Sequence, residues 1–212
     1  MEQTDRTRER RAEFWRTVGQ VGHQQAALGD ADEPGLWPGG ASAYLAVTTP
    51  HTGVVATDGL SDPAGDGRDA PGPGIELYTE GRELIAGPTG EGRWLVIALE
   101  EAAGALVGAG ASLTQALESH GVLSLELSGT DAPADWLSGG RMGALIGVEL
   151  PGRAREFDVD GTPVRVLALT PLRPSELQVV TAEGAAGRRR IAEALAGQGW
   201  YTYADSTRPP VV

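Results

Sequence analysis

Short turns join neighbouring strand-like runs in this chain, and this feature limits its possible folds more than any other. Residues 43–49 and 54–58 are rich in β-favouring residues and are separated by a four-residue Pro-His-Thr-Gly turn. Residues 155–159 and 163–170 flank Asp160-Gly161, the strongest hairpin signal in the sequence. Because tight turns connect antiparallel strands, these pairs predict a sheet that is at least partly antiparallel.

Helical patterns are gathered in blocks around these runs. Apolar residues at helical spacing predict one helix over residues 6–28 and two over residues 93–118, broken among the glycines. Two closing helices are predicted, the first beginning at Pro174 and the second covering residues 186–196. Further strands are predicted over 75–79, with one buried face, 122–127 and 142–150.

This order of elements predicts an α+β fold, a single domain in which helices pack on a mixed or antiparallel β-sheet. Residues 1–35, an N-terminal helix and an acidic loop, are expected to belong to the same domain as residues 36–212. The sequence has no repeat period or linker that divides it.

Charge is distributed unevenly along the 212 residues. The net charge is −12, and residues 30–101 hold thirteen acids against three arginines, a net charge of −10. A surface of this sign repels phosphate backbones, so nucleic acid is not expected as a partner. It attracts basic segments and speeds their encounter.

Several chemistries are excluded or unsupported by the residue types present. The chain has no cysteine, which excludes disulfides, thiolate metal sites and a cysteine nucleophile. Its three histidines share no ligand spacing, and it has no phosphate-binding loop, so we expect no cofactor and no metal. Charged residues fill the N-terminus, and Glu100 and Glu101 interrupt the longest apolar stretch, so we expect a cytoplasmic protein without membrane contact.

An enzymatic alternative centres on residues 58–69. Gly59-Leu60-Ser61-Asp62-Pro63 begins like the nucleophile elbow G-x-S-x-G, but Pro63 replaces the last glycine. Aspartates cluster among the glycines of this region as in a calcium loop, although their spacing fits no EF-hand and such residues commonly serve turns. The alternative is therefore a small hydrolase or metal-dependent enzyme that uses Ser61 or the Asp58/Asp62 pair.

Two motifs in the same region carry a resemblance. Thr57-Asp58-Gly59-Leu60-Ser61-Asp62-Pro63 is followed, after a Gly/Asp/Pro loop, by Gly74-Ile75-Glu76-Leu77-Tyr78. The pair resembles the signature of the suppressor-of-fused family, a G-L-S-D loop that leads into a G-x-E-L strand. The later succession of residues 144–148, a Phe157/Gly161 hairpin, residues 164–170 and Pro174-Ser175-Glu176-Leu177 is similar to that family as well.

The resemblance, which covers about residues 40 to 200, implies a non-enzymatic α/β sandwich-like domain that recognises other proteins. Animal members restrain transcription factors by gripping a short peptide as an added strand. For bacterial domains of this kind, the resemblance implies a role as immunity proteins against secreted toxins. The sequence shows no sign of the second domain of the animal proteins. The resemblance therefore favours a bacterial single-domain member.

We predict an immunity or regulatory protein that binds and neutralises or sequesters a partner protein or peptide, such as a toxin or a basic segment. An alternative stays open, in which the motif is a structural corner: Gly59 permits a turn with positive φ, Leu60 folds onto the core, and Ser61 and Asp62 cap free N–H groups. The candidate partner-contact residues are Asp58, Gly59, Leu60, Ser61, Asp62, Asp66, Asp69, Glu76 and Tyr78.

Overall fold

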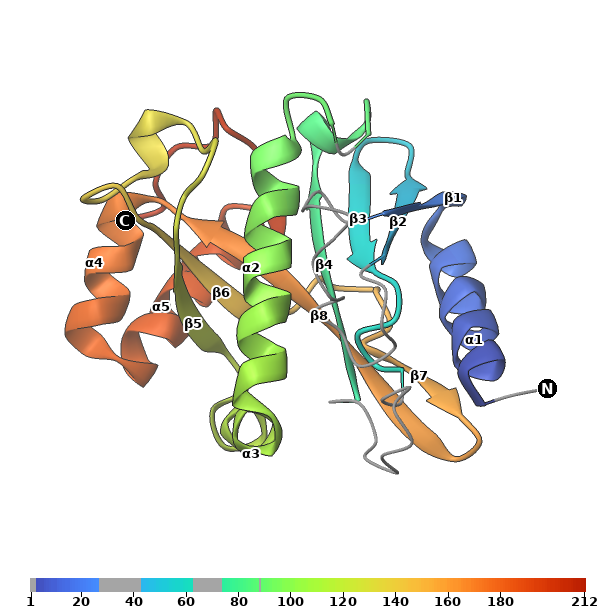
Figure 1. Ribbon diagram of the computed structural model, residues 1–212. Helices are drawn as coiled ribbons and strands as arrows, with labels where there is room; N and C mark the ends of the chain where they lie inside the picture. Colours follow the sequence, from blue (N-terminus) through green and yellow to red (C-terminus); the bar gives the residue numbers. More distant parts are fainter. Residues whose placement is uncertain (1–2, 27–42, 63–73, 88) are drawn as a thin grey trace.

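The computed structural model describes residues 3–26, 43–62, 74–87 and 89–212 (Figure 1). In chain order its elements are α1 (Gln3–Val18), β1 (Gln20–Ala26), β2 (Ala43–Thr48), β3 (Gly53–Thr57), β4 (Ile75–Gly81), η1 (Arg82–Leu84), α2 (Arg93–Ala109), α3 (Ala111–His120), β5 (Leu123–Leu127), η2 (Ala134–Trp136), β6 (Met142–Val148), β7 (Glu156–Val159), β8 (Thr162–Leu172), α4 (Pro174–Glu183), α5 (Ala185–Gly197) and β9 (Tyr203–Ala204).

The strands form one mixed sheet. Its order is β1-β2-β3-β4-β8-β6-β5, with β7 paired to β8 and β9 paired to β4. The contacts of β4 with β8 and with β9 are parallel, and the other pairings are antiparallel. The predicted α+β class, a single domain with a mixed sheet packed by helices, is confirmed, as are both predicted hairpins.

Helices cover both faces of the sheet because strand side chains alternate between the faces. On one face, Val55, Leu77 and Leu167 pack in a core with the apolar side of α2, which crosses in front of the sheet in Figure 1. Strand residues that face the opposite side of the sheet pack in two separate cores. One contains Phe14 and Trp15 of α1, and the other contains residues of α4 and α5.

The first helix is shorter than predicted. It ends at Val18, and residues 20–26, predicted as helix, form strand β1 instead. Pairing with β2 supplies backbone hydrogen bonds that outweigh the helical pattern of the side chains. Gly19 allows the sharp change of direction, since a Cβ at this position would lie 2.4 Å from the carbonyl oxygen of Thr48.

Strand β4 is more deeply buried than predicted. The sequence predicts one buried face, whereas all seven residues of Ile75–Gly81 are buried. The strand lies between β3 and β8 and both of its faces are covered, so even its glutamates lie in the interior. A glutamate in such a position needs a compensating partner.

The long helical middle breaks as predicted, at Gly110 between α2 and α3. Within the described residues, no single helix is both long and apolar enough to cross a membrane. Helices α2 and α3 meet these criteria only together, across a bend of 107°.

Candidate functional site

The GLSD and GxEL motifs meet around one arginine of the first helix. Arg11 of α1 is fully buried, with 0% of its surface exposed. Its Nε donates to Asp58 Oδ1 at 2.6 Å, and its Nη1 donates to Glu76 Oε1 at 2.7 Å and to Asp62 Oδ1 at 3.1 Å. One guanidinium group therefore joins three carboxylates from two separate motifs.

Glu76 of β4 lies at the centre of this cluster. Its Oε1 accepts hydrogen bonds from the Ser61 backbone N–H at 3.0 Å and from the Ser61 hydroxyl at 2.5 Å, while the Thr57 hydroxyl donates to Oε2. Burial raises the pKa of Glu76 above its ordinary value, and Arg11 and the hydroxyl groups oppose this rise. Burial acts to lower the pKa of Arg11, but the three carboxylates outweigh it and raise that pKa.

The motif therefore forms a corner of the interior that fixes α1 to the sheet. Gly59 has φ +125°, and a Cβ there would lie 3.2 Å from the Asp62 carboxylate. Leu60 is fully buried in the core, as the structural-corner alternative expects. Ser61 and Asp62, which that alternative assigns to capping the loop, bind Arg11.

The other predicted contact residues divide into two groups. Glu76 and Tyr78 are buried in β4, together with Asp58 at the end of β3. Asp66 and Asp69 lie outside the described residues, as does the acidic loop predicted over residues 30–40. The described members are thus brought together by the fold, with their side chains in the interior.

The same burial changes the interpretation of the acidic segment. Among the acids of residues 30–101 that the structure describes, four are buried: Asp58, Asp62, Glu76 and Glu80. Their arginine partners, Arg11 and Arg153, come from outside the segment. Part of the net charge of −10 is therefore neutralised inside the protein and does not contribute to its surface.

A second buried network, missed in the sequence, holds the C-terminal segment. Glu176 of the later motif binds Arg208 through both oxygens, at 2.6 and 2.8 Å, and accepts the Val211 N–H at 2.9 Å. The guanidinium carbons of Arg173 and Arg208 lie 4.2 and 5.2 Å from the centre of the Trp136 ring. The two motif glutamates thus hold opposite ends of the chain.

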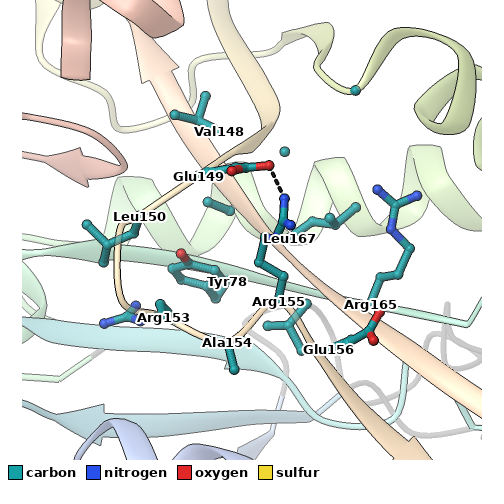
Figure 2. Close-up of a pocket in the computed structure, with 14 residues that line it drawn as sticks. Tyr78, Val148, Glu149, Leu150, Arg153, Ala154, Arg155, Glu156, Arg165 and Leu167 are labelled. Carbon is teal, nitrogen blue, oxygen red and sulfur yellow. Dashed lines mark hydrogen bonds and ion pairs between the residues drawn. The ribbon is translucent and has the colours of Figure 1, made fainter. Parts of the chain in front are cut away.

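A cavity lies at a break in the pairing along β8. Strand β6 pairs with β8 from Leu172 to Ala168, and β7 pairs with it from Thr162 to Arg165. Neither pairing includes Val166 or Leu167. A cavity of about 470 Å³ opens here, bordered by the loop between β6 and β7, and we call it the notch (Figure 2).

Three arginines line the notch. Arg153 is nearly buried, pairs with Glu80 and lies over the Tyr78 ring at 5.2 Å. Burial raises the pKa of Tyr78, and the nearby Arg153 opposes this rise. Arg155 pairs with Glu149 in an exposed position, and Arg165 has no ion pair among the described residues.

Two further cavities share walls with the notch. One, of about 450 Å³, shares Arg153 and continues toward Trp200 and Tyr203. The other, of about 390 Å³, shares residues 147–149 and continues along α5. Of the large apolar side chains in the described part of the chain, only Ile85 and Val212 are exposed.

Within the described ranges, no three His, Asp or Glu side chains are arranged to hold a metal ion. Around Asp58, Asp62 and Glu76, the guanidinium of Arg11 provides the positive charge. The three carboxylates are thus already compensated by the protein itself.

These features define the class of protein as an α+β domain with a mixed sheet covered on both faces and a buried ionic network at each end of the chain. No protein-family model matches the sequence, and no curated protein matches it. Among solved structures, the crystal structure of Drosophila Suppressor of Fused matches with 13% identity and a TM-score of 0.41. The match covers 90% of this chain but only 42% of that chain.

Proposed function

We propose that this protein is a non-enzymatic binding domain that recognises another protein or a peptide through the notch and its two flanking cavities. It would neutralise or sequester that partner, as an immunity or regulatory protein does, and act in the cytoplasm. The observation that carries the proposal is the break in the pairing along β8, which leaves a cavity of about 470 Å³ with a polar border. A cleft with a few converging polar groups is the usual form of a recognition site.

The interior of the motif supports a binding role over the enzymatic alternative. The Ser61 hydroxyl donates to Glu76 and accepts from Arg11, and its residue is 9% exposed. Asp58 and Asp62 are bound to the same arginine. A nucleophile or a metal ligand needs access to substrate, and these groups face a buried guanidinium instead.

The test begins with co-purification of the tagged protein from its source cell and identification of the partner by mass spectrometry. The partner is then produced separately and titrated by calorimetry against Ala154→Trp, which places a bulky side chain at the notch. The control is Ala186→Trp on α5, an exposed position that lines none of the three cavities. We expect Ala154→Trp to weaken binding at least tenfold and the control to leave it unchanged.

Two results would contradict the proposal. Equal binding by wild type and Ala154→Trp would mean that the partner does not bind at the notch. Absence of any protein partner at low salt, where electrostatic attraction is strongest, would remove the binding role itself.

A further inference from the structure

The three arginines of the notch differ in what they already bind. Arg153 is 11% exposed, and the buried carboxylate of Glu80 holds it against Tyr78. Glu80 also accepts the Thr52 hydroxyl at 2.5 Å, which fixes it further. Arg153 therefore forms a wall of the notch, and its charge is already compensated.

Arg155 is held much less firmly. It pairs with Glu149 across the loop between β6 and β7, and both side chains are about two-thirds exposed (66% and 65%). Exposed ion pairs contribute little to stability, because water solvates both charges almost as well. An incoming carboxylate that occupies the place of Glu149 can therefore exchange with it at small cost.

Arg165 completes the arrangement. It lies on β8 directly opposite Glu156 of β7, yet it forms no ion pair with any described residue. The backbone of both strands is fixed here, since Val166 N–H donates to the Arg155 carbonyl oxygen at 2.7 Å. Figure 2 shows the side chains of Arg155 and Arg165 extending in the same direction at the notch.

From this arrangement we infer that the notch binds an acidic segment of the partner, with an aspartate or glutamate side chain taken up by Arg155 and Arg165. The inference rests on the proposed binding function and names the chemistry of the partner. The planar guanidinium matches a carboxylate through paired N–H groups, which makes arginine suited to this recognition. Glu149 would be displaced and would act as an internal competitor for the same site.

The overall charge of −12 acts against this partner at long range. At 0.15 M salt, however, charges are screened over about 8 Å, so distant acids lose most of their effect while direct contacts persist. Selectivity would therefore come from the local pair of arginines and not from the field of the whole protein.

The test uses three fluorescein-labelled peptides of a common Gly/Ser sequence with a central Glu-Glu, Gln-Gln or Lys-Lys pair, titrated by fluorescence anisotropy at 0.15 M salt. We expect only the Glu-Glu peptide to bind. Arg155→Gln and Arg165→Gln should each weaken this binding about tenfold or more, as expected for loss of a charged hydrogen bond. Glu149→Gln should strengthen it several-fold, because the internal competitor is removed.

The matched control is Arg8→Gln, which removes the same charge from an exposed position on α1 and should leave binding unchanged. An equal effect of Arg8→Gln and Arg165→Gln would overturn the inference, since it would indicate general electrostatic attraction of the peptide and not binding at a defined site. Absence of Glu-Glu peptide binding at millimolar concentration would overturn it as well. Binding of the Lys-Lys peptide, abolished by Ala154→Trp, would overturn the acidic partner while leaving the proposed binding function intact.

Discussion

Replacement of Arg11 by methionine tests the assignment of the motif to a structural corner. The substitution keeps an unbranched side chain of good helix propensity in α1 but leaves Asp58, Asp62 and Glu76 buried without their guanidinium. Removing one partner of a buried ion pair costs about 3–5 kcal/mol. Because a domain of this size changes its Tm by about 2–4 °C per kcal/mol, we expect a decrease of roughly 6–20 °C.

Urea unfolding followed by tryptophan fluorescence measures this loss, since Trp15 of α1 is buried beside the sheet. Arg8→Met, an exposed position on the same helix, is the control and should change the free energy of unfolding by no more than about 0.5 kcal/mol. Arg11→Lys should fall between the two, because it keeps the charge but not the planar fork. A loss below about 1 kcal/mol for Arg11→Met would refute the reasoning, as it would mean that the carboxylates do not depend on Arg11.

Three further predictions concern other parts of the molecule. Because the pKa of Glu76 is raised in the folded state, the folded protein takes up a proton more readily than the unfolded chain. The stability of wild type relative to Glu76→Gln should therefore increase as the pH falls from 7 toward 4.5. Urea unfolding across that range measures the difference in unfolding free energy, and a difference that stays constant would argue against the prediction. Arg208→Met should destabilise the protein by about 3–5 kcal/mol and release the C-terminal segment from Glu176. The release is detected as faster removal of that segment by carboxypeptidase. Protection equal to that of wild type would contradict the role of Glu176. Gly19→Ala should reduce the free energy of unfolding by about 1–3 kcal/mol because its Cβ meets a backbone oxygen. Gly108→Ala, in the open part of α2, should be neutral or stabilising by up to about 1 kcal/mol. Both are measured by urea unfolding, and equal effects would refute the packing argument.

The buried arginine has a signal in the sequence, although motif reasoning did not use it. Arg11 lies on the same side of α1 as Phe14, Trp15 and Val18, at spacings of three, four and seven residues. A charged residue on the apolar side of an amphipathic helix requires a buried partner of opposite charge. The spacing indicates that such a partner exists, but only the fold identifies it.

The sequence by itself determined the local features of this protein. Turn residues specified both hairpins, and helical periodicity specified α2 to α5, because these signals depend on residues close together in the chain. The structural-corner alternative expected Leu60 in the core, where it lies, and the GLSD and GxEL motifs were identified together.

Only the tertiary structure decided how distant residues are compensated. Residues 20–26 became a strand because β2 offered a pairing partner, and Glu76 became an interior residue because β3 and β8 enclose β4. The Arg11 and Arg208 networks join residues from about 30 to 65 positions apart. The notch exists because the registers of β6 and β7 on β8 both stop short of Val166 and Leu167. These outcomes depend on burial and on pairing between distant segments, and a local sequence pattern contains neither. The free energy of a buried charge or of a strand is set by the residues that surround it in space.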